Sequence, residues 1–275
     1  MIFRLTASLL ALITVAGSSP AFAQTIPTSQ FGVQLDRGTG IVIATFEREE
    51  NRAFQYNPDE FGLASDRDFK GRATSNGASI FAARTLSRSV AIAVEAGFAS
   101  ASFYKSPSDA STLAGRVHES GLSYLQVEVD YSFLGESRLR PAAFLVTEIA
   151  LPHNTNKPLI GTPGVVVRPA LGAFKHFGNT IVLARLAGEY DSDSGTALDW
   201  GEWGVEAGAR IAGSFRITAG FEGTVGGSNN FDEVSLVTDA RWTSRRGLGI
   251  RAQNSVGFTT NNKGYSPEVG IVFQF

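Results

Sequence analysis

The sequence predicts an all-β protein: a single antiparallel up-and-down transmembrane β-barrel of about twelve strands. Three observations lead to this prediction. Apolar and polar side chains alternate along about twelve segments of the chain. The connections between these segments alternate between tight turns and longer polar loops. The last segment ends on an aromatic residue and has one apolar face, made of Val269, Ile271, Phe273 and Phe275.

The alternation of side chains has the period of two that is typical of strands. We expect strands near residues 39–48, 76–86, 89–103, 119–133, 138–151, 164–177, 179–191, 199–211, 214–226, 232–243, 247–259 and 267–275. An even number of strands places the first and last strand ends on the same side of the membrane. The whole stretch 39–275 is expected to form one barrel domain.

The connections are of two kinds. Five are tight, namely Ser87-Arg88, residues 135–137, Gly178, Gly213-Ser214 and residues 245–247. The others are longer and polar, and the longest runs from about residue 49 to residue 75. Short periplasmic turns and long extracellular loops are typical of outer-membrane barrels.

The charged residues indicate which face meets lipid. In the fourth segment Leu125, Val127 and Val129 alternate with Gln126, Glu128 and Asp130. A charge on the lipid face near the bilayer midplane costs about 2–4 kcal/mol, so the charged set is expected to face inward. A soluble secreted β-sandwich or lipocalin-like barrel also alternates, with its charged face outward. The turn–loop asymmetry and the aromatic residues at the strand ends favour the membrane barrel.

The N-terminal residues predict export. Residues 1–23 contain Arg4, an apolar run over residues 9–16 and the small-residue ending Ala21-Phe22-Ala23. This is the pattern of a secretory signal peptide, and the run is too short for a spanning helix. Residues 24–38 are expected to form a short periplasmic lead-in to the barrel.

The composition excludes some functions. Without Arg4 the chain has 23 cationic and 26 anionic side chains, a net charge of about −3, so there is no electrostatic case for nucleic acid. The absence of cysteine excludes disulfides and thiolate sites. Arginine outnumbers lysine 19 to 5, which suits ion pairs in a confined space because guanidinium groups are weakly hydrated.

The inward positions predict a charged lumen, by which we mean the barrel interior. The expected lumen-lining residues are Arg84, Glu95, Glu128, Asp130, Arg138, Arg140, Glu148, Arg168, Arg185, Glu189, Glu202, Glu206, Arg210, Arg216, Glu222, Asp239, Arg241 and Arg251. Most of the arginines fall near the short-turn end, and many acids fall near the loop end. These side chains either leave a narrow passage or pair with one another and plug the interior. Both readings stay open.

Two further groups of residues are candidates for a site. His118 and Ser120 form an H-x-S pattern that resembles the His/Ser pairs of outer-membrane phospholipases and lipid A deacylases. Gly121 and Leu122 follow where those enzymes have asparagine and glycine, and the register of Glu128 and Asp130 places the pair inside the barrel. We therefore expect no enzyme activity, with a lipid hydrolase as the less favoured alternative.

The second group lies in a stiff loop with three prolines, Pro152–Gly164. His153, Asn154, Asn156 and Lys157 give this loop donors and acceptors at the mouth. The loop either folds over the mouth and constricts it or braces the rim. No cofactor or metal is expected, because residues 191–195 lack the distal glutamate of a calcium loop and no histidine has zinc spacing.

The whole mature chain resembles Gram-negative outer-membrane β-barrels, in particular the small outer-membrane transporters of the MetA-pathway-of-phenol-degradation type. The signal peptide, the twelve-segment layout and the ending Val269–Phe275 carry this resemblance. It implies the outer membrane of a Gram-negative bacterium, contact with outer-membrane lipid, and recognition by the barrel-assembly machinery through Val269, Ile271, Phe273 and Phe275. It also implies transport of small solutes. We rank a narrow channel for small polar or charged solutes first, a structural or loop-displaying barrel with a plugged lumen second, and an enzyme third.

Overall fold

The computed structural model describes residues 25–63, 67–193, 198–212, 214–224, 233–258 and 264–275. The predicted signal peptide, residues 1–23, lies outside the described residues. No helix in the described ranges is long and apolar enough to cross a bilayer.

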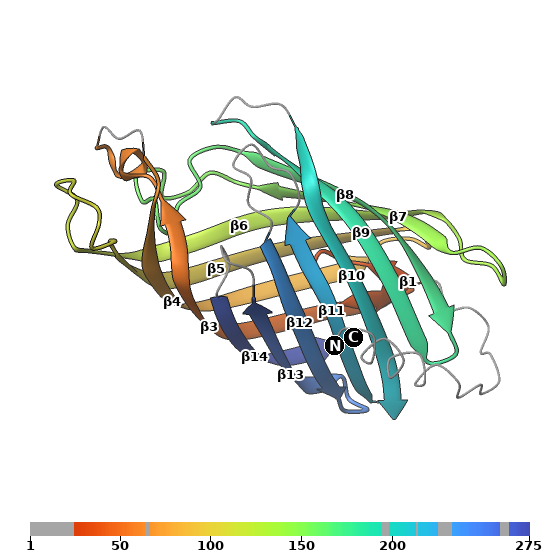
Figure 1. Ribbon diagram of the computed structural model, residues 1–275. Helices are drawn as coiled ribbons and strands as arrows, with labels where there is room; N and C mark the ends of the chain where they lie inside the picture. The colour runs from red at the N-terminus through yellow and green to blue at the C-terminus, as the bar shows by residue number, and fades with distance from the viewer. Residues whose placement is uncertain (1–24, 64–66, 194–197, 213, 225–232, 259–263) are drawn as a thin grey trace, which may run out of the picture.

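The described part of the chain forms a closed barrel of twelve antiparallel strands. Figure 1 shows how the strands are arranged. Each strand pairs with its neighbours in the sequence, and β14 pairs with β3 to close the barrel. The strands are β3 (Gly40–Tyr56), β4 (Phe69–Thr85), β5 (Val90–Tyr104), β6 (Arg116–Leu134), β7 (Ala142–Ala150), β8 (Val166–Phe177), β9 (Thr180–Asp191), β10 (Asp199–Ala212), β11 (Phe215–Thr224), β12 (Glu233–Thr243), β13 (Leu248–Gly257) and β14 (Gly264–Gln274). The predicted up-and-down barrel and its number of strands are therefore confirmed.

The closing pair brings the two ends of the barrel sequence together. The backbone nitrogen of Gly40 donates to the carbonyl oxygen of Phe275 at 2.7 Å, and the nitrogen of Phe275 donates to the carbonyl oxygen of Gly40 at 3.0 Å. Both ends lie at the end of the barrel that carries the tight turns, which we call the turn end. The opposite end is the loop end.

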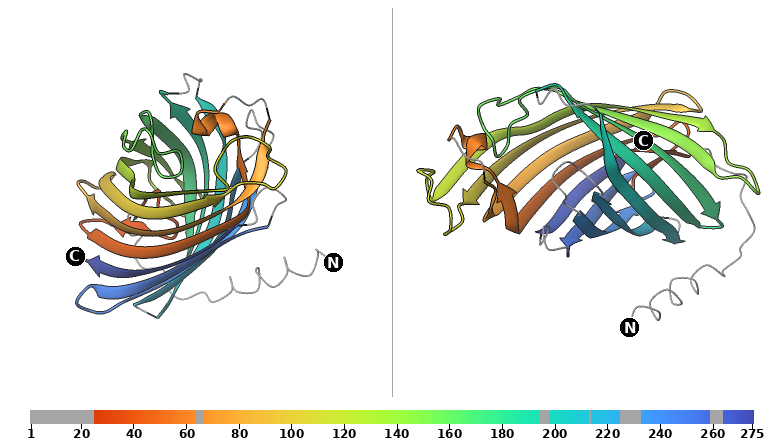
Figure 2. Two further views of the ribbon diagram at one scale, coloured as in Figure 1. Left: turned by 90° about the vertical axis from the view of Figure 1, so that its left-hand side faces the viewer. Right: turned by 45° about the horizontal axis from the view of Figure 1, so that its top comes forward.

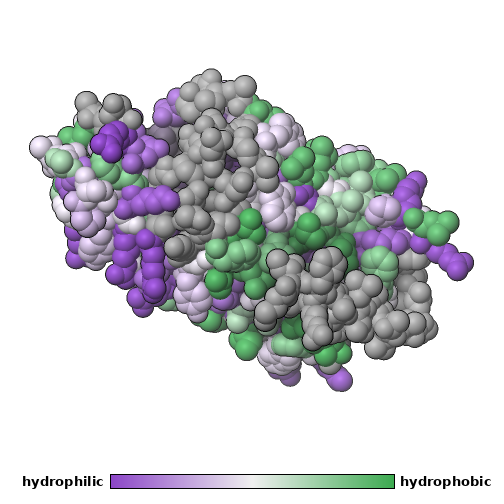
Figure 3. Space-filling view, in the orientation of Figure 1, coloured by the Kyte–Doolittle hydropathy of each residue, from purple (hydrophilic) through white to green (hydrophobic). Residues whose placement is uncertain are grey.

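The outer face of the barrel is apolar. Val269, Ile271, Phe273 and Phe275 are all exposed, with Ile271 at 61% of its full exposure. The same holds for Val127, Val129 and Tyr131 on β6, whose neighbours Glu128 and Asp130 are fully buried. In the view of Figure 3, hydrophobic residues gather across the middle and right, whereas the left-hand end, where β3 and β4 project, is mostly hydrophilic. Such an apolar belt needs lipid around it.

Four strands project beyond this belt at the loop end. β3, β4, β5 and β6 have 17, 17, 15 and 19 residues, whereas about 9–11 residues suffice to cross a bilayer. Figure 2 shows the loops that these strands carry. The projection shortens the connection expected over residues 49–75 to residues 57–68, which include a 3₁₀ helix, Pro58–Phe61. Between the projecting strands, the ring centroids of Tyr56 on β3 and Phe103 on β5 are 4.5 Å apart, and both rings are buried.

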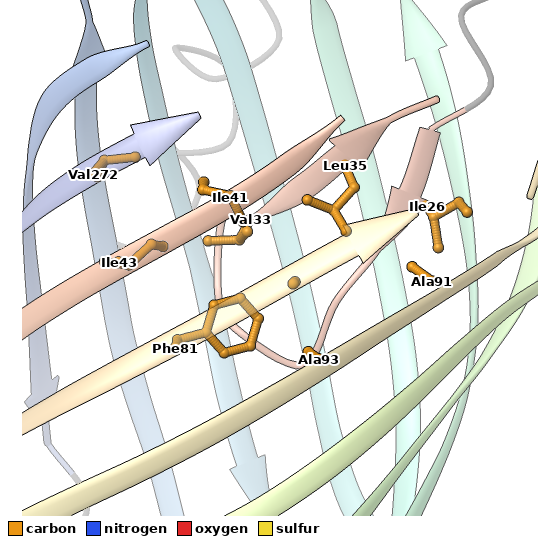
Figure 4. Packing of buried hydrophobic residues seen from close by; sticks show 10 residues of the cluster. Ile26, Val33, Leu35, Ile41, Ile43, Phe81, Ala91, Ala93 and Val272 are labelled. Carbon is orange, nitrogen blue, oxygen red and sulfur yellow. The ribbon is translucent and has the colours of Figure 1, made fainter. Parts of the chain in front are cut away.

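A small hairpin fills part of the lumen. β1 (Thr25–Pro27) pairs only with β2 (Gln34–Asp36). Its apolar side chains Ile26, Val33 and Leu35 are buried, and Figure 4 shows them facing β4 and β5. They form one apolar cluster with inward-facing residues of β14, β3, β4 and β5, namely Val272, Ile41, Ile43, Phe81, Ala83, Ala91 and Ala93.

This placement differs from the expected periplasmic lead-in over residues 24–38. Residues 25–36 lie inside the barrel because one sector of its inner wall is apolar, and burying that sector against the hairpin removes it from water. The three residues 37–39 connect the hairpin to β3, with the nitrogen of Thr39 bonded to the carbonyl oxygen of Asp36 at 3.1 Å.

Candidate functional site

The lumen around the hairpin is the candidate functional site. While one side of the hairpin packs on the apolar sector, its backbone and polar side chains face charged residues of other strands. The nitrogen of Ser29 donates to the carboxylate of Glu128 at 2.9 Å, and the Ser29 hydroxyl bonds the other oxygen of that carboxylate. Nε2 of Gln30 donates to Glu95 at 2.9 Å. The hairpin is therefore held by wall residues of β6 and β5.

The turn of the hairpin is held from the far wall. Gly32 donates its backbone N–H to the carboxylate of Glu206, on β10, at 2.9 Å. The guanidinium of Arg185, on β9, donates to the carbonyl oxygen of Ser29 at 2.8 Å. Arg251, on β13, donates to the carbonyl oxygen of Phe31 at 2.8 Å. Hydrogen bonds to charged groups contribute about 1.5–3 kcal/mol each, so these contacts fix the hairpin across the lumen.

Gly32 is required at its position by two features. Its φ of +69° is in the left-handed region, which favours glycine. A Cβ atom there would lie 3.0 Å from Oδ1 of Asp239 and 3.2 Å from Oγ1 of Thr218 on the barrel wall. The turn of the hairpin thus approaches the wall more closely than a side chain would allow.

Arg251 is the most deeply paired charge of the lumen. Its side chain is 1% exposed and its guanidinium forms ion pairs with Asp239 and, at 3.2 Å, with Glu268. Two other pairs lie farther toward the loop end. Nε of Arg168 lies 2.7 Å from the carboxylate of Glu189, and Arg185 forms an ion pair with Glu222. Paired charges reduce the cost of desolvation in the interior.

Asp130 is an exception to this pairing. It is fully buried, and neither carboxylate oxygen has a hydrogen-bond partner among the described residues. On the same inner face of β6 lies Glu128, whose register partner on β7 is Glu148. Within the described ranges, however, no group of three or more ligating side chains has the arrangement of a metal site.

Three cavities border the hairpin, and all lie on the side away from its apolar seat. One of about 250 Å³ lies between Ser29 and residues that include Glu148, Arg168 and Glu202. A second of about 190 Å³ lies between the hairpin and β8–β11, with His176 and Asn179 in its lining. A third of about 880 Å³ lies at the turn end, against Asp36 and residues of β10–β14. The hairpin narrows the polar side of the lumen without filling it.

Most of the predicted lumen residues do face inward. The register and the burial of alternate residues place fifteen of the eighteen on the inner face: Glu95, Glu128, Asp130, Glu148, Arg168, Arg185, Glu189, Glu202, Glu206, Arg210, Arg216, Glu222, Asp239, Arg241 and Arg251. The rule that charges on membrane strands face inward holds at these positions.

The other three residues lie elsewhere, which corrects the prediction. Arg84 is exposed on the outer face of β4, because the inner positions Phe81 and Ala83 are apolar and pack against the hairpin. Close to a tight turn, a long arginine side chain can extend to the membrane interface. Arg138 and Arg140 are exposed in the turn before β7. The strand starts only at Ala142 because Pro141 has no N–H for the ladder.

The sequence-based prediction missed the hairpin residues that contact the wall, chiefly Ser29, Gln30, Gly32 and Asp36. A signal for them was present, because Ile26, Val33 and Leu35 alternate with polar residues on both sides of the polar stretch 28–32. This is a weak hairpin pattern.

The loop after β7 lies against the inner face of β6. Asn154 donates to the carbonyl oxygen of Leu122, and Lys157 donates to that of Ser120, both at 2.6 Å. His153 forms a β-bridge with Thr162, and Asn156 is exposed. The contacts of Asn154 and Lys157 brace the loop on β6, whereas those of His153 lie within the loop. The loop also occupies space on the inner side, since a Cβ atom on Gly121 would lie 3.1 Å from Asn154.

The predicted position of His118 and Ser120 inside the barrel is wrong. A β-bulge lies between the pairs Gly97–Tyr124 and Phe98–Leu122, so that one extra residue of β6 shifts the alternation. Both residues are exposed and lie on the outer face of the projecting strands. The ring of His118 contacts Ser102 on β5, with Nδ1 and Oγ 3.0 Å apart. The pairing between His118 and Ser120 that the pattern suggested is not formed.

Comparisons with known proteins agree with this fold. The crystal structure of the COG4313 outer membrane channel from Pseudomonas putida F1 is similar at a TM-score of 0.61 and 14% identity, over 94% of this chain and all of that one. The KdgM porin is similar at 0.52 and 9% identity, over 85% and 99%. The β domain of the Bordetella autotransporter BrkA is similar at 0.50 and 14% identity, over 86% and 100%.

Neither comparison by sequence finds a relative. No family model matches this chain. No curated protein matches it either. At these low identities the solved structures show a shared fold. Together with the apolar belt, that fold makes the chain a transmembrane barrel of the outer-membrane type and agrees with the predicted location in a Gram-negative outer membrane.

Proposed function

We propose that the protein is a narrow outer-membrane channel for small polar or charged solutes, in which the hairpin of β1 and β2 sets the width of the passage. The series of three cavities along the polar side of the hairpin carries this proposal. Solutes would pass between the hairpin and β7–β13, past charged side chains of both signs. The opposite side is sealed by the apolar cluster.

In this proposal the constriction lies at the hairpin turn. There Arg185 reaches Ser29 and Glu206 reaches Gly32 across the lumen. Charged side chains and backbone groups at a constriction select small solutes by size and charge. The channel and porin neighbours support transport, and one neighbour is a KdgM porin in complex with disordered oligogalacturonate.

The alternative is a plugged barrel that displays loops. The hairpin itself favours it, because five wall residues hold it by direct contacts. The two functions differ in what a loosened hairpin does. β1 and β2 pair only with each other, so releasing them leaves the ladder of the wall intact.

Conductance in planar bilayers tests the proposal. We expect small conductance steps for the wild type and larger ones for Leu35→Asp, because a carboxylate is disfavoured in the apolar seat of the hairpin. Leu139→Asp is the matched control, since Leu139 is 93% exposed in a turn. Absence of conductance in the folded wild type, whether or not Leu35→Asp conducts, would favour the plugged scaffold.

A further inference from the structure

An unusual row of arginines crosses the inner face near the turn end. The register places Arg210 opposite Arg216, Arg216 opposite Arg241, and Arg241 opposite Arg251. Four neighbouring strands, β10 to β13, therefore present like charges side by side. Like charges directly opposite each other destabilise a sheet, so such a row calls for a compensating anion.

Among the described residues, carboxylates pair closely with one end of this row and only loosely with the other. Arg251 is paired with Asp239 and Glu268. Arg210 and Arg216 share a single carboxylate, that of Asp36 on the hairpin, and each is 3.7 Å from the same oxygen. Arg241 is 4% exposed, and its buried Nη1 has no hydrogen-bond partner among the described residues. A buried donor without a partner is costly, so the protein leaves this part of the row incompletely compensated.

The part of the row other than Arg251 borders the cavity of about 880 Å³ at the turn end. Arg210, Arg216, Arg241, Arg245 and Arg246 line it, and Asp36 is the single acidic side chain among its described lining residues. Among these side chains, five positive charges and one negative charge leave an excess of four positive charges. The cavity is large enough for a small molecule and strongly positive.

We infer that this cavity binds small oxyanions, solutes that carry carboxylate or phosphate groups, through Arg216 and Arg241 with Arg210 beside them. Guanidinium groups match the geometry of both kinds of oxyanion and bind them with paired, charge-assisted hydrogen bonds. The inference rests on the proposed channel for its biological meaning, since a site at the inner end of the passage would select anionic solutes. Binding itself does not require an open passage.

Calorimetry on the folded, detergent-solubilised barrel at low ionic strength tests this, with inorganic phosphate and succinate as separate probes. We expect binding of at least one probe by the wild type. Arg216→Gln combined with Arg241→Gln should weaken it roughly tenfold or more, because two charge-assisted contacts are lost. Asp36→Asn should strengthen it, because a competing carboxylate is removed. Binding of phosphate alone would identify a phosphate site, and binding of succinate alone a carboxylate site.

Arg138→Gln combined with Arg140→Gln is the matched control, because it removes two exposed arginines in a turn at the same end of the barrel. An equal loss of affinity in this control would show that the effect depends only on the net charge of the barrel, and it would overturn the proposed site. So would binding of neither probe by the wild type. If the Arg216 and Arg241 variant does not fold, Asp36→Asn decides, and unchanged affinity there counts against the site. Conductance separates the two proposals: current without binding contradicts this site alone, and binding without current contradicts the channel alone.

Discussion

The carboxylate of Glu128 accepts hydrogen bonds from both the backbone nitrogen and the hydroxyl of Ser29, a residue 99 positions earlier in the chain. Glu128 lies on the barrel wall and Ser29 lies in the turn of the lumenal hairpin. This contact joins two segments that are distant in sequence and have no backbone pairing with each other. The hairpin is therefore held in the lumen by side chains, which makes its hold sensitive to single substitutions.

Gly32→Val is expected to loosen the hairpin. Valine at a φ of +69° is strained by about 1–3 kcal/mol, and its side chain would also collide with Asp239 and Thr218. We predict longer open times or larger conductance steps in planar bilayers. Gly62→Val is the control, because Gly62 has a φ of +76° but no neighbour within 4 Å of the added Cβ. Equal behaviour of the two variants would show that the contact with the wall is unimportant.

Glu136→Gln is expected to destabilise the barrel in a manner that depends on pH. The carboxylate of Glu136, in the turn before β7, accepts from the backbone nitrogen of His176 at 2.9 Å and pairs with Lys175 at 3.2 Å. Burial opposes ionisation, but the hydrogen bonds from His176 and Lys175 prevail and hold the pKa of Glu136 below 4.5.

A lowered pKa means that this stabilisation is full above the unfolded value of 4.5 and is lost as the pH falls through the lower folded value. We predict that Glu136→Gln lowers the temperature at which the barrel unfolds at pH 7, read from its changed migration on SDS gels. The difference from the wild type should shrink as the pH falls below the unfolded value of 4.5. A difference that stays constant down to pH 3 would contradict the role of the carboxylate charge.

His118→Ala is expected to leave lipid hydrolysis unchanged. The ring of His118 contacts Ser102 and makes no hydrogen bond with Ser120. The sequence pattern H-x-S therefore does not form a nucleophile–base pair. The measurement is release of fatty acid from phospholipid and from lipid A by the reconstituted barrel. Ser120→Ala is the companion variant. Loss of an activity in His118→Ala, with the barrel folded, would instead favour the enzyme at the outer rim.

Phe275→Ala is expected to reduce the yield of folded barrel in the outer membrane. The ring of Phe275 stacks on Phe273 at 5.8 Å, and its backbone exchanges two hydrogen bonds with Gly40 at the closing pair. We propose that this ending is also what the barrel-assembly machinery recognises. The folded fraction can be read from the migration of unheated samples on SDS gels. Phe258→Ala is the control, because Phe258 is equally exposed (56% against 53%) but lies past β13 at the loop end. Similar yields from both variants would argue against a special role of the terminal residue.

Much of the barrel could be predicted because a membrane restricts what each face may carry. The alternation around Glu128 and Asp130 gave the correct inner face of β6, since a charge in lipid is costly. The same reasoning failed at Arg84, where the inner face is apolar because a separate hairpin covers it. A local pattern contains no information on such a distant partner.

The position of His118 could not be predicted for a different reason. One unpaired residue in β6 reverses the alternation beyond it, and the sequence marks this change of phase only by the adjacent apolar residues Tyr124 and Leu125. Likewise, the row from Arg210 to Arg251 depends on the register of four strands, which becomes known only when the strands are paired. The four arginines were predicted to face inward, but the sequence did not predict that they lie next to one another.

The apolar seat of the hairpin spans the line along which the barrel closes. Val272 belongs to the last strand, Ile41 and Ile43 belong to the first, and all three join the same cluster as Ile26, Val33 and Leu35. The hairpin thus adds side-chain cohesion between β14 and β3, where the chain itself provides no covalent continuity. It follows that displacing the hairpin would also remove its side-chain contacts across the seam between β14 and β3. In the proposed channel, the width of the passage and the cohesion of the barrel wall are therefore coupled through one short segment.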